Sequence, residues 1–136
     1  MSKVKRAAAL ALGMAATLAA SVALSAPAMA ASSPAAACGG GSYHVIDSHA
    51  LGGYATIYLL YNGSTNCVVT WKKGSYAGNT TYVDAVLNVW NTPGAFDAGN
   101  YRYYAGPAKA KAPGKCIKWG GAYGNSSYES PWEHCG

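Results

Sequence analysis

Short segments in which apolar and polar residues alternate recur along the chain after residue 42. A period of two is typical of β-strands, whose successive side chains point to opposite faces. The strongest segments are 54–62 and 81–90, both rich in β-branched and aromatic residues. In 81–90 every second residue from Val83 to Val89 is apolar, whereas both faces of 54–62 carry large side chains. We therefore predict two central strands, and no segment after residue 31 has a convincing helical period.

Glycine, proline and asparagine divide the rest of this region into shorter units. Pro93 and Gly94 predict a loop at 91–99, and the Gly/Ser/Asn-rich composition of 120–136 predicts an irregular tail. About six or seven short strands separated by turns indicate an all-β fold, either a small antiparallel sandwich or a barrel. The weaker strands are expected at 43–49, 67–73, 101–105, 108–112 and 115–119.

The first thirty residues follow a different pattern, in which three basic residues precede an apolar run at 7–24. The run is followed by the small-x-small triplet 28–30, and this order is typical of a secretory signal peptide. A membrane anchor is the alternative, but the run is rich in Ala and barely reaches spanning length at about 18 residues. We expect cleavage after Ala30 and secretion of the remainder. No second apolar stretch of spanning length follows, so we expect no transmembrane anchor after cleavage.

Four cysteines follow the signal peptide, and an even number in a small exported domain predicts two disulfides. All three pairings are open from the sequence. We favour Cys38 with Cys67 and Cys116 with Cys135, because each pair brackets one compact region of the chain. The nearest two cysteines are 19 positions apart, unlike the paired spacing of zinc sites. We expect residues 31–42 to be an irregular N-terminal arm and 43–136 to be a single disulfide-stapled β domain.

Removal of the signal peptide changes the charge of the protein. Seven of the ten Lys and Arg residues and all five Asp and Glu residues remain, so the net charge falls from +5 to +2. Lys109, Lys111, Lys115 and Lys118 cluster in the sequence. A solvated lysine face is the simpler explanation, so we expect no nucleic-acid partner and at most a weak attraction to anionic wall polymers.

Residues with catalytic potential form no established motif. Asp47, Ser48 and His49 supply the three residue types of a hydrolase triad, but neighbouring strand residues point to opposite faces. No Gly-x-Ser-x-Gly turn is present to display a nucleophilic serine.

The acidic residues near the C-terminus, Glu129 and Glu133, lie close to His134 in the sequence, and Asp47 would have to approach them through folding. A paired-carboxylate glycosidase would also need a cleft that the sequence does not reveal. The histidines, His44, His49 and His134, lack the spacing of a zinc site. We therefore predict no catalytic residue, no metal site and no cofactor.

All eleven tyrosines, all four tryptophans and the only phenylalanine follow residue 30. Aromatic residues flanked by Gly, Ser and Asn are typical of sugar-binding platforms and protein contacts. The alternative is that they pack against the core and hold the tail. Our candidates for ligand contact are Trp119, Tyr123, Tyr128 and Trp132.

Five segments together resemble the spore-associated protein A family of filamentous actinobacteria. They are 53–62 (GYATIYLLYN), 66–70 (NCVVT), 103–107 (YYAGP), 112–121 (APGKCIKWGG) and 128–136 (YESPWEHCG). The combination of WGG after one cysteine with a terminal EHCG is specific, whereas each alone would be weak. The resemblance implies a small exported protein found with spores or aerial hyphae, and it supplies no catalytic or ligand-binding residues.

These observations predict a non-enzymatic secreted protein of the spore or hyphal surface, retained by cell-wall polysaccharide or a spore-surface protein. One alternative is a small secreted inhibitor or antagonistic protein acting on another protein, with residues 91–100 as its reactive loop. Another is a small hydrolase acting through Glu129, Glu133 or His134.

Overall fold

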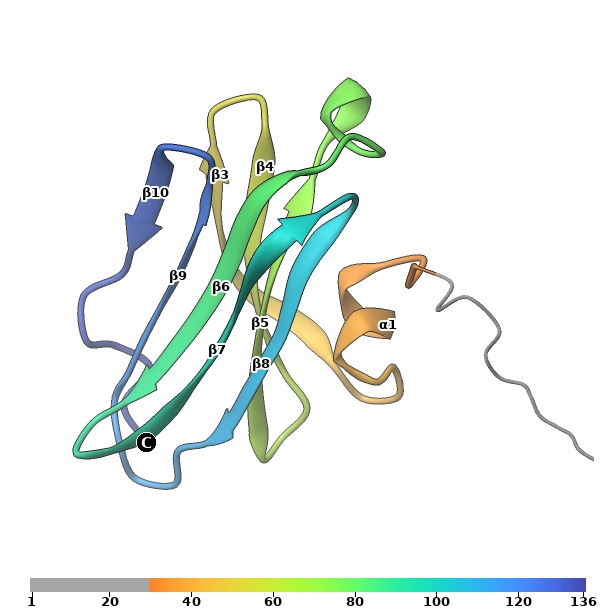
Figure 1. Ribbon diagram of the computed structural model, residues 1–136. Coiled ribbons are helices and arrows are strands. Elements are labelled where there is room, and N and C mark those ends of the chain that lie inside the picture. Colours follow the sequence, from red (N-terminus) through yellow and green to blue (C-terminus); the bar gives the residue numbers. More distant parts are fainter. Residues whose placement is uncertain (1–29) are drawn as a thin grey trace, which may run out of the picture. The chain divides into compact units, whose positions relative to one another are not determined.

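The computed structural model describes residues 30–136 and contains eight strands in two four-stranded antiparallel sheets (Figure 1). The first sheet has the order β3 (His44–Leu51), β4 (Ala55–Tyr61), β5 (Thr65–Lys72) and β8 (Tyr104–Lys111). The second has the order β10 (Ser126–Glu129), β9 (Ile117–Tyr123), β6 (Thr81–Val89) and β7 (Thr92–Tyr101). A short helix, α1 (Pro34–Cys38), precedes the strands, and a 3-10 turn, η1 (Gly74–Tyr76), joins β5 to β6. The predicted signal peptide lies outside the described residues, apart from Ala30.

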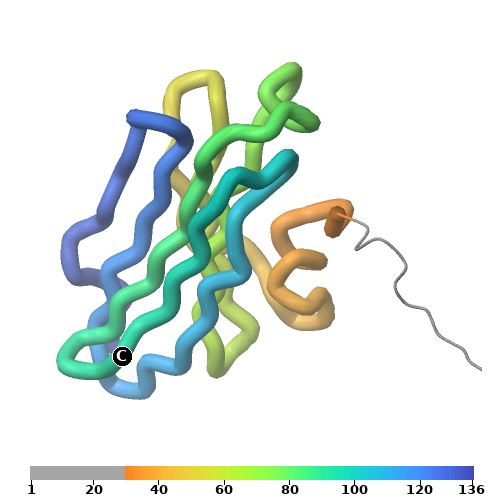
Figure 2. Tube along the Cα trace, viewed as in Figure 1, coloured from red at the N-terminus to blue at the C-terminus, as the bar shows by residue number. Residues whose placement is uncertain are grey.

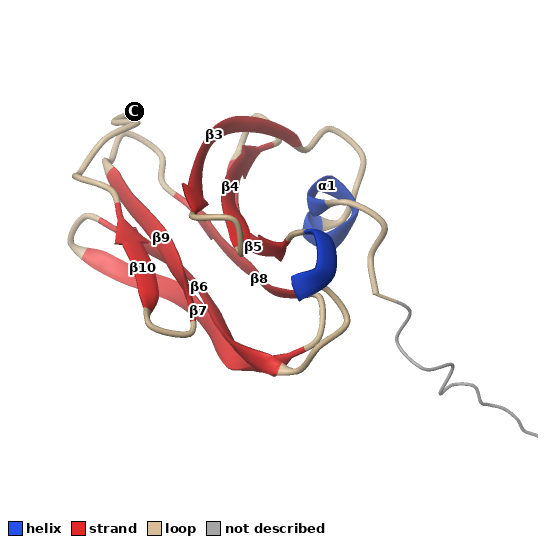
Figure 3. Ribbon diagram, turned by 90° about the horizontal axis from the view of Figure 1, so that it is seen from above, coloured by secondary structure: helices blue, strands red, loops and turns tan. Residues whose placement is uncertain are grey.

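The two sheets pack face to face around a shared core, as the view from above shows (Figure 3). Alternate apolar side chains of β4 and β6 belong to this core, as a period of two requires, and Val68 of β5 and Ile117 and Trp119 of β9 join them. The all-β antiparallel prediction is confirmed, and the architecture is a sandwich. The largest fully buried side chains of the core cluster are those of Trp119, Ile57, Leu59, Leu87, Ile117, Val68 and Val83.

A smaller apolar cluster covers the outer face of β4 and β5 and explains why 54–62 carries large residues on both sides. The fully buried Leu60 and Val69 belong to it, together with the Cys38–Cys67 disulfide. Helix α1 packs here, beside β5 and β8 (Figure 2). Residues 31–42 were expected to be irregular, yet they contain this one-turn helix. Its N-cap is Ser33, whose hydroxyl accepts a hydrogen bond from the Ala36 amide at 3.0 Å.

The predicted loop at 91–99 is wrong, because Thr92–Tyr101 forms β7 and pairs with β6 along its length. Pro93 is tolerated because β7 is an edge strand, where one side of the backbone needs no partner. Gly94 lies opposite a register shift at Leu87/Val89, and a Cβ atom there would approach the Leu87 carbonyl oxygen to 2.2 Å. The turn signals therefore marked a bulged edge strand.

Two further differences change the number of strands: two predicted strands merge into one, and one strand is added, which together with β7 gives eight instead of the predicted six or seven. Segments 101–105 and 108–112 do not form two strands, because Tyr104–Lys111 is the single strand β8 with a register shift against β5. The predicted tail at 120–136 contains the end of β9 and all of β10. These strands pair from Gly120 opposite Glu129 to Tyr123 opposite Ser126. Within residues 30–136, no helix is long and apolar enough to cross a membrane.

The glycine pair of the WGG motif allows neighbouring backbones to approach closely. A Cβ atom on Gly120 would lie 2.1 Å from the Tyr128 carbonyl oxygen of β10. A Cβ atom on Gly121 would lie 2.2 Å from Thr70 Oγ1 and 2.6 Å from the Asp84 carbonyl oxygen. The Thr70 hydroxyl donates a hydrogen bond to that carbonyl at 2.7 Å, so β5 of one sheet is linked here to β6 of the other.

Gly121→Ala is therefore expected to lower the free energy of unfolding by about 1–3 kcal/mol, because the added methyl group collides with backbone and with the inter-sheet hydrogen bond. Urea unfolding measures the loss. Gly53→Ala is the matched control, since a Cβ atom there meets nothing within 4 Å, and it should change stability by about 0.5 kcal/mol or less. Equal stability of the two variants would contradict the proposed close packing.

The crossing from β7 to β8 is held by Asp97. Its carboxylate accepts one hydrogen bond from the Tyr101 hydroxyl and one from the Gly106 amide, both at 2.7 Å. The hydrogen bond to Asp97 raises the pKa of Tyr101 above its usual value, and burial adds to the effect.

A raised tyrosine pKa stabilises the folded state below the unfolded pKa of about 10, and this contribution is lost as pH rises through the higher folded pKa. Tyr101→Phe should therefore be less stable than the parent at pH 7, with the difference shrinking in alkaline solution. Urea unfolding at a series of pH values tests this. Tyr103→Phe, a change at a neighbouring exposed tyrosine, should show no such convergence.

Candidate functional site

The four aromatic candidates do not form one surface. Trp119 is only 1% exposed and lies in the core between the sheets, so its assignment to a contact surface is wrong. Its indole Nε1 donates a hydrogen bond to Glu133 Oε2 at 2.7 Å. The flanking glycines, which suggested exposure, instead allow close strand packing around a buried ring.

Tyr128 and Tyr123 are half-buried and packed against other rings. Tyr128 of β10 stacks on His49 of β3, with ring centroids 3.5 Å apart. Tyr123 stacks on Tyr54 at 5.2 Å and meets the edge of Tyr76 at 5.9 Å. All three ring contacts reach from the second sheet toward residues of the first sheet and its connections, which is a packing role.

We call Tyr54, Tyr76 and Tyr123 the tyrosine group, and a buried lysine lies beside it. Lys72 is 2% exposed, and its ammonium donates hydrogen bonds to the carbonyl oxygens of Asn79 and Tyr101. The ammonium also lies 5.7 Å from the Tyr123 ring centroid. Burial lowers the pKa of Lys72. These contacts hold the segment after β5 against the end of β7.

Trp132 is the candidate that remains exposed, and its partner was not predicted from the sequence. It is 37% exposed and meets Trp90, which is 56% exposed, edge to face at 5.1 Å. The Lys118 ammonium lies 4.9 Å from the Trp132 ring centroid. We call Trp90, Trp132 and Lys118 the tryptophan patch. Trp90 lies in the tight β6–β7 turn, and its amide donates to the Cys116 carbonyl, so both rings are held by the region around the second disulfide.

The tryptophan patch and the tyrosine group lie near opposite ends of β9. Lys118 is at the start of the strand and Tyr123 at its end. At about 3.3 Å per residue, these positions are more than 15 Å apart. A ligand contacting the patch would therefore not contact Tyr123 through the same small binding site.

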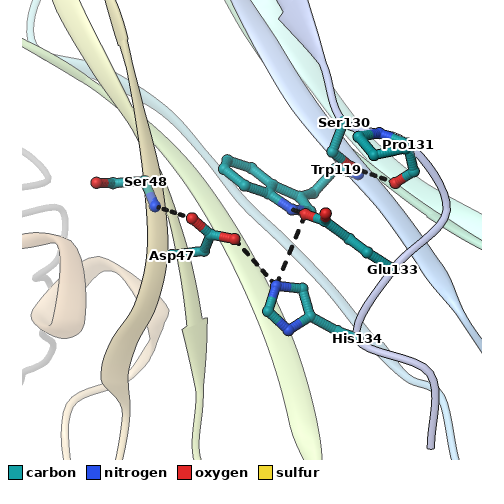
Figure 4. A network of polar contacts seen from close by, with 7 residues as sticks. All are labelled: Asp47, Ser48, Trp119, Ser130, Pro131, Glu133 and His134. Atoms are coloured by element: carbon teal, nitrogen blue, oxygen red, sulfur yellow. Dashed lines mark hydrogen bonds and ion pairs between the residues drawn. The ribbon is translucent and has the colours of Figure 1, made fainter.

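Three polar side chains that are distant in the sequence meet at the side of the sandwich where β3 and β10 form the sheet edges (Figure 4). His134 Nε2 lies 3.0 Å from Asp47 Oδ2 and 3.7 Å from Glu133 Oε2. One donor atom from each residue lies within 4.8 Å of the others. We call these residues the Asp–Glu–His cluster. All three side chains are partly exposed, and neither carboxylate has a Lys or Arg partner within ion-pair distance among the described residues.

The C-terminal tail is responsible for this convergence. Glu133 pairs with Ile117 through two backbone hydrogen bonds of 2.8 and 2.9 Å, so the tail returns alongside β9. Two residues after Glu133, Cys135 is fixed by its disulfide with Cys116. His134 adopts a left-handed backbone with φ of 50° and thereby faces β3.

A groove of about 580 Å³ opens beside the cluster. It lies between the first residues of β3, the β4–β5 turn, the connection from β8 to β9 and the C-terminus. Its lining includes Ile46, Asn66, Lys111 and His134.

The other residues with catalytic potential do not join the cluster. His49 stacks on Tyr128, and Ser48 contributes its amide, which donates to Asp47 Oδ1 at 2.9 Å. Glu129 is exposed on β10. Of the residues considered for a hydrolase, only Glu133, His134 and Asp47 come together. The proposed inhibitory loop at 91–100 is not a loop, because it lies in β7.

The four lysines that cluster in the sequence make separate contacts in the fold. Lys109 donates to the Cys38 carbonyl at 2.8 Å, Lys115 donates to Thr92 Oγ1 at 2.6 Å, and Lys118 lies over Trp132. Lys111 lines the groove.

No family model matches the chain, and no solved structure matches it. Over 102 residues it is 40% identical to spore-associated protein A of Streptomyces coelicolor. The alignment covers 73% of this chain and 64% of the relative, so the chain spans less than two thirds of the length of that curated protein. The resemblance predicted from the five sequence segments is confirmed.

The two tryptophans of the candidate set should lose very different amounts of stability when truncated to alanine. Trp119→Ala is expected to lower the free energy of unfolding by about 3–5 kcal/mol, because it empties a core site and leaves Glu133 without its donor. Trp132→Ala should cost about 1 kcal/mol or less, since it removes one exposed ring contact. Thermal and urea unfolding of both variants distinguish the two environments, and a large loss in Trp132→Ala alone would reverse the assignment.

Proposed function

We propose, from the similarity of this chain to spore-associated protein A, that it is a secreted, non-enzymatic protein of the spore or hyphal surface, retained there by cell-wall glycan. The name of the relative supports the location. The observation that supports glycan binding is the exposed tryptophan patch.

Indole rings are costly to leave in water, and a pair held at a fixed angle exposes two apolar faces at once. The apolar C–H faces of sugar rings fit such surfaces. The Trp90 and Trp132 rings meet at 82°, so the two exposed rings form a corner whose faces point in different directions. Lys118 places a positive charge at this corner and adds attraction to anionic wall polymers.

The patch also has the rigidity that binding requires. Trp90 is carried by a two-residue turn between paired strands, and Trp132 lies three residues before a disulfide-bonded cysteine. Little conformational freedom is therefore lost when a ligand binds.

The experiment is sedimentation of the oxidised protein, residues 31–136, with purified peptidoglycan, chitin and washed spores at low and high salt. The test variant is Trp90→Ala/Trp132→Ala. The matched control is Phe96→Ala/Tyr103→Ala, which removes two other exposed aromatic rings, 64% and 44% exposed. We expect salt-resistant binding that weakens about tenfold or more in the test variant only, since each ring contact contributes about 0.5–1.5 kcal/mol.

Other outcomes would change the proposal in defined ways. Binding that disappears at high salt would assign retention to the lysines. Binding to washed spores but to neither purified polymer would indicate a spore-surface protein as the partner. Equal binding of the test and control variants would rule out the tryptophan patch, and an absence of binding to all three materials would overturn retention and favour an inhibitor acting on another protein.

A further inference from the structure

We propose that the Asp–Glu–His cluster binds one divalent first-row transition-metal ion, of which Zn²⁺ is the probe. The ligands are one oxygen each from Asp47 and Glu133 and Nε2 of His134. This site is separate from the tryptophan patch and does not depend on the proposed function.

The spacing of the donor atoms fits a shared ion. Zn–N and Zn–O bonds are about 2.0–2.2 Å long, so neighbouring ligands around a tetrahedral ion are about 3.3 Å apart. The separations from His134 Nε2 to the Asp47 and Glu133 oxygens, 3.0 and 3.7 Å, lie on either side of this value. The side chains point toward one another from β3 and the tail (Figure 4), so small movements bring all three to one ion.

Both carboxylates are oriented by groups outside the cluster. The Ser48 amide holds Asp47 Oδ1 and leaves Oδ2 directed at His134. The buried Trp119 indole holds Glu133 Oε2, and a carboxylate oxygen has a second lone pair for a metal. Hydrogen bonds of this kind fix the ligands of metal sites before the ion arrives.

The charge of the cluster also favours a cation. Two carboxylates lie close together, and among the described residues the one basic group in ion-pair contact with them is the imidazole of His134. One oxygen of Asp47 and one of Glu133 lie within 4.8 Å of each other, and two negative charges this close repel in a partly buried environment. A divalent ion neutralises both at once.

The donor set selects the type of ion. Imidazole with carboxylate favours zinc and its neighbours, whereas Ca²⁺ takes six to eight oxygen ligands and Mg²⁺ an octahedral set. Three protein ligands leave a fourth position, and the adjoining groove, which His134 also lines, gives solvent access to it. An ion here would join β3 of one sheet to the tail held on β9 of the other, so binding should stabilise the fold.

The test is calorimetric titration of the oxidised protein with ZnCl₂, with thermal unfolding as a second readout. We expect one saturable site and an increase in Tm with Zn²⁺, but no comparable site for CaCl₂. His134→Asn and Asp47→Asn should each weaken Zn²⁺ binding about tenfold or more and abolish the increase in Tm. Asn tolerates the left-handed backbone at 134, and an amide oxygen at 47 can still accept from the Ser48 amide.

His44→Gln is the matched control. Like His134, His44 is an exposed histidine, but it lies on β3 and outside the cluster. It should bind Zn²⁺ as the parent does. Near-UV circular dichroism without metal establishes that each variant is folded. Absence of saturable Zn²⁺ binding at millimolar concentration, or equal binding by parent and folded His134→Asn, would overturn the proposal. Normal Zn²⁺ binding by Trp90→Ala/Trp132→Ala would show that the two sites are independent.

Discussion

The return of the C-terminal tail onto β9 is the interaction on which both surface features depend. The Cys116–Cys135 disulfide and the paired backbones of Ile117 and Glu133 fix the tail. Closing such a loop stabilises the fold by about 3 kcal/mol in the chain-entropy model, mainly by restricting the unfolded chain. Once the tail is fixed, its residues point in different directions. Trp132 meets Trp90, while Glu133 and His134 turn toward β3 and the buried indole of Trp119.

The two long sides of the sandwich are closed by different means. On one side the chain passes from β7 to β8 through two residues, and Asp97 ties the crossing with hydrogen bonds. On the other side β3 and β10 are the sheet edges, and side chains connect them across the gap. These are the stacked rings of His49 and Tyr128 and the contact of Asp47 with the tail. Edge strands with unpaired backbone groups are prone to pair with other chains, so contacts along this side protect the edge as well as forming the cluster.

Local patterns predicted what local physics determines. The alternation in 81–90 gave β6 because each inward position is filled by an apolar side chain of fitting size, and the spacing of the cysteines favoured the pairing that forms. Pro93 and Gly94 misled because a turn residue has the same local preference in a bulged edge strand as in a loop. Trp119 was wrongly predicted to be exposed, because the burial of its side chain depends on packing against the opposite sheet, which its neighbours in the sequence do not reveal. Asp47 and His134 are 87 positions apart, so no spacing rule could reveal their contact.

The two motifs whose combination made the family resemblance specific form one structural unit. In the WGG motif, the glycines let β9 lie against β10 and the first sheet, and Trp119 can then fill the space between the sheets. In the EHCG motif, Glu133 accepts the hydrogen of that indole, which would otherwise be a buried donor without a partner, and Cys135 locks the arrangement. Either motif alone leaves a polar group or a chain end unsatisfied. Together they also place His134 where it meets Asp47, so the features that stabilise the fold are those that assemble the proposed metal site.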